Sequence, residues 1–241
     1  MNLSSHPTSD DTSDRLPFTL TGARRGARQS LPLALGTAAY GLVFGALARQ
    51  AGLSLIEAVS MSGLVYAGAA QLISLELWAP SLPIVAIVLT TFVVNARHLL
   101  MGATLQPWFG RLSPKRGYAS MFFLTDESWA LTQRDLATSR RDGAVMVGCG
   151  LVLMAAWVGS TAAGHTLGAV AGDPARWGLD VAPLAVFAAL LVAGWDGRHR
   201  LVPWLTAAVV AIAAEHWLPG AWYVPAGGLA GGMVGALRDE D

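Results

Sequence analysis

Long apolar segments bounded by charged residues, glycine or proline dominate this chain and constrain its fold more than any other feature. One of them, Leu82 to Leu105, exceeds the roughly 20 apolar residues that a helix needs to cross a bilayer. Backbone N–H and C=O groups must find partners within the segment when hydrocarbon surrounds it, so such segments are predicted to be helices. We therefore expect an all-α polytopic membrane protein, and the charged fraction of 13% is low enough for that class.

Six to eight transmembrane segments are expected, and two of the apolar segments are doubtful as full crossings. Residues 55–77 carry Gly68 and Gln71 near their middle, and residues 118–132 contain Asp126 and Glu127. These two segments either cross the membrane or are re-entrant or broken, in which case they would line a transport route. The segments are Leu31 to Ala48, Leu55 to Leu77, Leu82 to Leu105, Tyr118 to Thr132, Ala144 to Ala171, Val181 to Trp195, Leu201 to Trp217 and Trp222 to Leu237.

The distribution of Arg and Lys favours the re-entrant or broken alternative, because these residues accumulate near span ends on the cytoplasmic side. Eight full crossings from a cytoplasmic N-terminus would leave ten basic residues inside and five outside. If residues 55–77 and 118–132 do not cross, the counts become thirteen and two. Residues 1–28 are polar and lack an apolar signal-peptide core, so they are predicted to be a disordered cytoplasmic tail. Residues 29–241 would then form a single transmembrane domain.

A polar cluster lies inside the segment Leu82 to Leu105, where Asn95, Arg97 and His98 fall within one helical turn. An arginine within the membrane is unfavourable unless it faces a partner or a watery cavity, so it usually has a function. Arg97 can bind a carboxylate bidentately, Asn95 can orient it, and His98 can exchange a proton near neutral pH. The alternative is that Arg97 extends to an interface and His98 bonds a nearby backbone group. We favour a substrate site.

Two further polar groups lie in the doubtful segments. Asp126 and Glu127 place adjacent carboxyls inside or at the mouth of an apolar segment, which suits proton carriage or capture of an ammonium group. The same stretch also matches a helix N-cap, and chemistry alone favours neither interpretation. The motif Tyr66-Ala-Gly68-Ala-Ala-Gln71 combines small residues with an amide, which fits either substrate reaching unwound backbone or tight helix packing.

Glycines recur at helical spacing in two apolar segments. The pattern Gly-x4-Gly-x3-Gly appears twice, followed by Ala-Leu-Ala in the first segment and by Ala-Val-Ala in the second. Glycines four apart allow close contact between helix backbones. Helix packing explains the pattern fully, and a duplicated scaffold is the weaker alternative. The glycines predicted to pack helices are Gly36, Gly41, Gly45, Gly164 and Gly168.

Several classes of activity find no support in the sequence. Cys149 is the single cysteine, so no intramolecular disulfide or multi-thiolate metal site can form. The one lysine, Lys115, lies outside any G-x4-G-K-[ST] motif, and H-E-x-x-H and G-x-S-x-G are both missing. We therefore expect no enzyme, no cofactor, no metal and no nucleic-acid partner.

The ordered set of motifs resembles one known family. Pro32-x3-Gly36 with Phe44-Gly45, Tyr66 to Gln71, Asn95 to His98, and Leu124-Thr-Asp-Glu127 follow one another as in the AzlC-type permeases, the large subunit of the branched-chain amino acid exporter family. The resemblance covers about residues 30–240, with Tyr66 and Ala70 where the family more often has Phe and Ser. It implies export of branched-chain amino acids across the bacterial inner membrane, with a small AzlD-type membrane protein as partner.

We therefore predict a secondary transporter subunit that exports branched-chain or related neutral amino acids. The residues predicted to bind substrate are Asn95, Arg97, Gly68, Gln71 and Asp126, and those predicted to couple protons are His98, Asp126 and Glu127. Arg97 and Asn95 would hold the substrate carboxylate, and Asp126 or Glu127 would take the ammonium. The alternatives are a membrane scaffold that positions a small partner and a small-solute channel.

Overall fold

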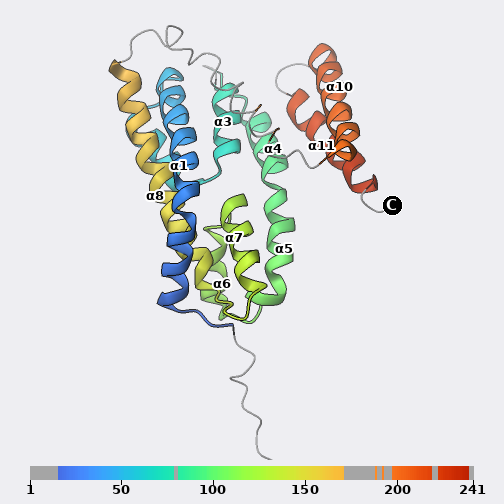
Figure 1. Cartoon of the computed structure of the whole chain (residues 1–241). Helices are drawn as coiled ribbons and strands as arrows, with labels where there is room; N and C mark the ends of the chain where they lie inside the picture. Colours follow the sequence, from blue (N-terminus) through green and yellow to red (C-terminus); the bar gives the residue numbers. More distant parts are fainter. Residues whose placement is uncertain are drawn as a thin grey trace, which may run out of the picture. The chain divides into compact units, whose positions relative to one another are not determined.

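The structure is a computed structural model that describes residues 16–78, 81–170, 188, 192, 197–218 and 222–238. Within these ranges all regular structure is helical, which confirms the predicted all-α class. The predicted segment Val181 to Trp195 lies almost wholly outside them. The helices are α1 Leu20–Gln50, α2 Leu55–Leu64, α3 Gly68–Glu76, α4 Ile84–Asn95, α5 Arg97–Phe109, α6 Pro114–Met121, α7 Asp126–Leu136, α8 Ala144–Val170, η2 Arg198–Arg200, α10 Leu201–Trp217 and α11 Tyr223–Arg238 (Figure 1).

Three helical stretches in the described part of the chain are long and apolar enough to cross a membrane. They are Leu20–Gln50, Ile84–Phe109 and Ala144–Gly168. The two segments that were doubtful as full crossings are each broken into two short helices, with 10 and 9 residues in α2 and α3 and 8 and 11 residues in α6 and α7. At a rise of about 1.5 Å per residue, none of these four helices crosses a bilayer by itself.

The N-terminal part of α1 begins earlier than the sequence suggested. The tail was expected to be disordered up to residue 28, whereas the helix starts at Leu20. Thr19 caps this helix, because its Oγ1 accepts a hydrogen bond of 3.0 Å from the N–H of Gly22. The difference therefore has a local cause, a capping threonine ahead of a polar but helix-compatible stretch.

The chain divides into two compact units, and the expected single transmembrane domain over residues 29–241 stays a prediction. The first unit comprises Met1–Leu33 and Leu100–Leu153. Its apolar core brings together the side chains of α5, α6, α7 and α8, and Leu105 and Met146 are fully buried in it. The second unit comprises Ala34–Leu99 and Met154–Asp241. Because the unit boundaries fall at Leu33 and Leu153, helices α1 and α8 contribute residues to both.

Helices α1 and α8 pack closely within each unit (Figure 1). In the first unit a Cβ built at Gly26 would overlap the carbonyl of Val145. In the second unit a Cβ at Gly45 would overlap the carbonyl of Thr161, and one at Gly164 would overlap that of Leu42. Glycine is needed at these positions because the two helix backbones leave no room for a side chain.

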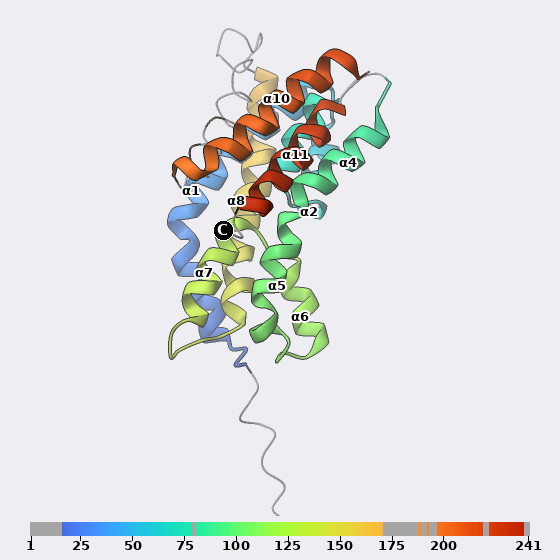
Figure 2. The same ribbon diagram turned by 90° about the vertical axis from the view of Figure 1, so that its right-hand side faces the viewer.

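The core of the second unit forms around α1, α2, α3 and α8. Phe44 and Trp157 stack there with ring centroids 5.7 Å apart, and Phe44 is fully buried. In the same unit α11 packs against α10 and α4, as Figure 2 shows. Gly227 and Gly231 of α11 face the α10 backbone, where a Cβ would come within 2.8 and 2.9 Å of the carbonyls of Ala207 and Pro203.

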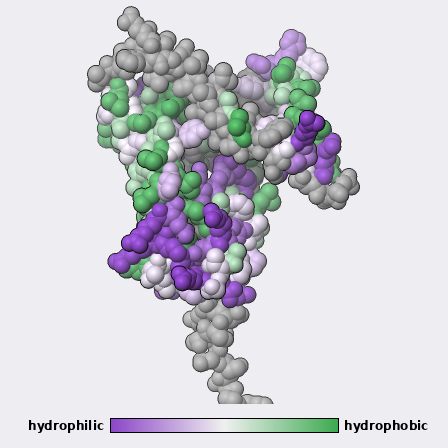
Figure 3. Space-filling view, viewed as in Figure 1, coloured by the Kyte–Doolittle hydropathy of each residue, from purple (hydrophilic) through white to green (hydrophobic). Residues whose placement is uncertain are grey.

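Hydrophilic and hydrophobic side chains are unevenly distributed over the surface. Hydrophilic residues gather over α7 and the first turns of α1 in the view of Figure 3. The arginines of these two helices include three exposed ones, Arg24, Arg28 and Arg134. Elsewhere, large apolar side chains such as Leu35 and Leu64 are more than three quarters exposed. Such exposure suits helices whose surroundings are hydrocarbon.

Candidate substrate site

The helix that carries Asn95, Arg97 and His98 is discontinuous at this motif. Helix α4 ends at Asn95 and α5 begins at Arg97, with Ala96 between them. The N–H of Leu99 donates to the carbonyl of Ala96 at 3.0 Å, so it does not reach the Asn95 carbonyl one residue earlier. His98 takes its place: Nδ1 lies 3.0 Å from the Asn95 oxygen, and since a carbonyl can only accept, Nδ1 carries the hydrogen.

A pocket of about 480 Å³ opens beside this break. Apolar side chains form most of its wall, and Asn95 and Thr91 supply the polar groups. Oδ1 of Asn95 is buried and has no hydrogen-bond partner among the described residues. A buried unpaired acceptor is unfavourable by about 1–3 kcal/mol, which a ligand donor would relieve. The lining residues are Ile87, Val88, Thr91, Phe92, Asn95, Ala96 and Leu99.

Arg97 is exposed on the first turn of α5 and does not line that pocket. Arg97 follows Asn95 by two residues, so Asn95 is the last residue before the break and Arg97 is the first residue after it. The motif therefore carries a side chain that can bind a carboxylate bidentately two residues after the amide whose unpaired oxygen lies at the pocket.

The segment with Gly68 and Gln71 is also broken at its motif. Tyr66, between α2 and α3, is buried and has a φ of 48°, a left-handed conformation that is unfavourable for a residue with a side chain. This turn lets α3 begin at Gly68. A Cβ atom at Gly68 would lie only 3.0 Å from Cη2 of the Trp157 ring. The small residue is therefore needed for contact with α8.

Gln71 is fully buried and takes part in a polar network that joins α2, α3 and α8. Its Nε2 donates to Ser62 Oγ at 3.3 Å, and its Oε1 accepts from Trp157 Nε1 at 3.2 Å. Ser62 in turn hydrogen-bonds Thr161 at 2.8 Å. The Gln71 side chain thus has protein partners at both ends of its amide, and its predicted role in substrate binding stays a prediction.

Asp126 and Glu127 lie in the first unit, both exposed in the first turn of α7. Thr125 is the N-cap of this helix and forms a capping box with Ser128: the N–H of Ser128 donates to Thr125 Oγ1 at 3.3 Å, and the N–H of Thr125 donates to Ser128 Oγ at 2.8 Å. Both carboxyls also interact favourably with the positive end of the helix dipole. This geometry matches the capping interpretation of the motif. The predicted binding of substrate by Asp126 and the predicted proton coupling by both carboxyls stay predictions.

The predicted packing glycines differ in their surroundings. A Cβ at Gly41 would overlap Ser160, one at Gly45 the carbonyl of Thr161, and one at Gly168 would lie 3.4 Å from the Cα of Ala46. By contrast, no described atom lies within 4 Å of the Cβ position of Gly36. Gly36 therefore has space for a side chain, unlike Gly41 and Gly45.

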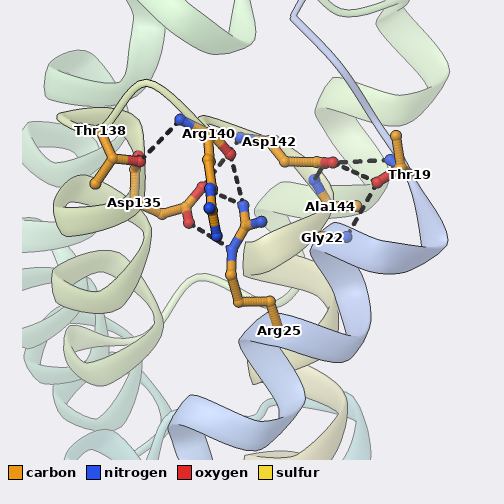
Figure 4. Close-up of polar contacts among 8 residues, drawn as sticks. All are labelled: Thr19, Gly22, Arg25, Asp135, Thr138, Arg140, Asp142 and Ala144. Carbon is orange, nitrogen blue, oxygen red and sulfur yellow. Dashed lines mark hydrogen bonds and ion pairs between the residues drawn. The ribbon is translucent and has the colours of Figure 1, made fainter.

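One polar network in the first unit was not anticipated from the sequence. Arg25 forms a bidentate ion pair with Asp135, with Nε to Oδ1 at 2.8 Å and Nη2 to Oδ2 at 2.9 Å, and Nη2 also donates to the carbonyl of Arg140 (Figure 4). Asp142 accepts from Thr19 Oγ1 and from the N–H of Ala144. These contacts tie the start of α1 to the α7–α8 loop. The sequence shows the separate parts, an Arg-rich helix start and a loop flanked by Asp135 and Asp142, but gives no signal that pairs them.

Apolar helices of membrane-crossing length, interrupted at polar motifs, define an α-helical membrane protein built with discontinuous helices. A family model described as AzlC protein matches residues 32–171, and the chain belongs to the AzlC family. The matched range ends well before residue 240, the limit expected from the motifs. No solved structure matches the chain.

Three relatives extend this comparison. An uncharacterized membrane protein of Archaeoglobus fulgidus is 32% identical over 73% of this chain and 77% of its own length. The inner membrane protein YgaZ of Escherichia coli is 29% identical over 88% of this chain and 87% of its own. The branched-chain amino acid transport protein AzlC of Bacillus subtilis is 23% identical over 77% and 72%.

Proposed function

We propose that this protein is the large subunit of a secondary transporter that exports branched-chain or related neutral amino acids, and that the pocket beside Asn95 receives the substrate side chain. The pocket itself is the main support, because it combines apolar walls with a buried, unpaired amide oxygen at a helix break. The name of the Bacillus subtilis relative supports the substrate class. A small AzlD-type membrane protein is proposed as the partner.

In the proposed binding mode, Arg97 and the two ends of the Asn95 amide bind the charged groups of the substrate. The Arg97 guanidinium and the Asn95 amide N–H hold the carboxylate, while Asn95 Oδ1 accepts a hydrogen bond from the ammonium. The branched side chain lies against residues such as Ile87, Val88 and Phe92. Gly68 and Gln71 contact substrate once the network around Trp157 opens.

Proton coupling is assigned to His98 and to the pair Asp126 and Glu127. His98 Nδ1 is engaged with the Asn95 carbonyl, so Nε2 is the nitrogen that gains or loses a proton. Protonation there would add charge next to the carboxylate site and so link substrate binding to the proton gradient. The direction of transport is proposed as outward, driven by that gradient or by substrate accumulation.

Leucine efflux from proteoliposomes, with and without the small partner, tests the proposal. Asn95→Ala and Arg97→Gln should each reduce efflux about tenfold or more, the loss of one good hydrogen bond or ion pair. Arg28→Gln, an exposed arginine outside the site, is the control and should transport like the wild type. Normal efflux by Asn95→Ala and Arg97→Gln would remove these residues from the site. Flux that never saturates would favour a channel, and no flux or binding with either composition would favour a scaffold.

A further inference from the structure

A second pocket, separate from the one beside Asn95, lies in the second unit where α1 ends, α2 begins and α8 approaches its last turns. Its volume is about 600 Å³. It differs from the first pocket because its wall contains charged groups of both signs and an imidazole. The lining residues are Arg49, Gly52, Leu53, Ser54, Leu55, Glu57, His165 and Thr166.

The two charged groups of this pocket do not neutralise each other by direct contact. Neither Arg49 nor Glu57 forms an ion pair with any residue that the structure describes, so the guanidinium of Arg49 and the carboxylate of Glu57 are more than 4.0 Å apart. The aliphatic stem of Arg49 passes Gly168, with Cδ 3.6 Å from the Cβ position of that glycine. Arg49 makes no hydrogen bond in the described part of the chain.

Glu57 is held in place but keeps one oxygen available. The N–H and Oγ of Ser54 both donate to its Oε2 at 2.7 Å, in the capping box that begins α2. Oε1 has no hydrogen-bond partner within the residues that the structure describes. The cap therefore fixes the carboxylate at the rim of the pocket and uses only half of its capacity to accept hydrogen bonds.

His165 adds a second acceptor. The ring is buried, and its Nε2 lies 2.8 Å from the carbonyl oxygen of Leu53. Because a carbonyl only accepts, Nε2 must carry the hydrogen, and Nδ1 of the neutral ring is left with a lone pair. Leu53 and Leu55 supply apolar surface in the same pocket. The pocket therefore offers a guanidinium to an anionic group of a ligand and a carboxylate and a ring nitrogen to an ammonium group. Its two leucines can contact a hydrocarbon side chain.

We infer that this pocket is a second binding site for a free zwitterionic α-amino acid, with its carboxylate on Arg49 and its ammonium on Glu57 and His165. Arg49 stands in the last turn of α1, a helix long enough to cross a membrane, so the site lies at a span end and serves as a vestibule. The inference deepens the proposed function, since it names a place where the transported solute is held apart from the pocket beside Asn95.

Protection of an engineered cysteine tests this site directly. In the Cys149→Ala background, Thr166→Cys places the single thiol in the pocket wall, and Ser139→Cys, exposed in the first unit, is the matched control. Labelling by a charged maleimide is measured in phosphatidylcholine vesicles with the full transporter. At about ten times its Kd, leucine should slow labelling of the pocket cysteine about tenfold and leave the control unchanged.

Two analogues of leucine and two variants of the protein then test which charged group of the ligand each pocket residue binds. Leucine amide lacks the carboxylate and 4-methylpentanoate lacks the ammonium, so each should need about tenfold more ligand for half-protection than leucine. Arg49→Gln should abolish the difference between leucine and leucine amide, and Glu57→Gln, which can keep the cap, should abolish most of the difference between leucine and 4-methylpentanoate. The analogue comparison needs no variant and so holds if one variant fails to fold.

Leucine efflux measured in the same vesicles separates this inference from the proposed function. Efflux without protection of the pocket cysteine, or equal protection by leucine and both analogues, overturns the second site and leaves the transport function standing. Protection without efflux supports the site and counts against transport. Phosphatidylethanolamine, a zwitterionic headgroup, is added in a further arm: if it protects the cysteine and leucine adds nothing, the occupant is lipid and the inference is wrong.

Discussion

The indole N–H of Trp157 donates to Oε1 of Gln71 across 3.2 Å and thereby joins α8 to the start of α3. The same indole covers the Cβ position of Gly68 and stacks on Phe44. One side chain therefore fills the space beside a helix break, satisfies a buried amide and packs the core. The motif from Tyr66 to Gln71 is thus in contact with α8 through Trp157 at both Gly68 and Gln71.

Trp157→Phe is expected to destabilise the protein by about 1–3 kcal/mol, because the phenyl ring keeps the stacking on Phe44 but leaves Gln71 Oε1 without a donor. Thermal unfolding of the purified protein in detergent measures the change. Trp217→Phe removes an indole that is 79% exposed and should leave the unfolding temperature nearly unchanged. Equal shifts in the two variants would show that the hydrogen bond to Gln71 contributes nothing.

The ion pair of Arg25 and Asp135 gives a second prediction. The Asp135 side chain is 5% exposed and that of Arg25 28%, so removing the guanidinium leaves a buried carboxylate without its cation. Arg25→Gln should lower stability by about 2–4 kcal/mol, and Arg25→Lys by less, since lysine keeps the charge but not the bidentate geometry.

Unfolding temperature is again the measurement, with Arg24→Gln, an exposed neighbour, as the control. If Arg25→Gln and Arg24→Gln unfold at the same temperature, the pair between Arg25 and Asp135 does not stabilise the first unit.

Two glycines of α1 should respond oppositely to alanine. Gly45→Ala forces a methyl group onto the carbonyl of Thr161 and should cost about 1–3 kcal/mol or more through separation of α1 and α8. Gly36 has no described atom within 4 Å of its Cβ position, so Gly36→Ala should stabilise the helix by about 0.5–1 kcal/mol. A chemical-denaturation series on both variants checks the sign, and a loss of stability at Gly36 would mean that this position is packed in the membrane.

Much of the fold could be predicted because its causes are local. Apolar length predicted the helices, and the breaks near Gly68 and before Asp126 coincide with polar or small residues in mid-segment. The break at Ala96 was not predicted: the polar residues around it were interpreted as a substrate site, and no Gly or Pro lies within five residues of it. The structure shows this break through the hydrogen bond between His98 Nδ1 and the Asn95 carbonyl.

Hydrogen bonds and ion pairs between residues far apart in the chain could not be predicted from the sequence. Arg25 and Asp135 are 110 residues apart, and His165 bonds a backbone carbonyl 112 residues away. Counting basic residues on the two sides of the membrane says nothing about their partners, because pairing depends on how helices pack. The motif residues were therefore identified from sequence, whereas the two pockets and the network around Asp142 required the fold.

The pocket beside Asn95 allows a prediction about substrate size. Val88 lines this pocket, and Val85, one helical turn earlier on α4, is exposed and does not. Val88→Phe adds a ring to the pocket wall, so it should reduce leucine efflux more than alanine efflux, changing their ratio about tenfold, since each methylene excluded from an apolar site is worth about 1 kcal/mol. Val85→Phe adds the same volume outside the pocket and should leave the ratio unchanged. Competition between labelled leucine and alanine in one proteoliposome preparation measures the ratio directly, and an unaltered ratio in Val88→Phe would place the substrate side chain elsewhere.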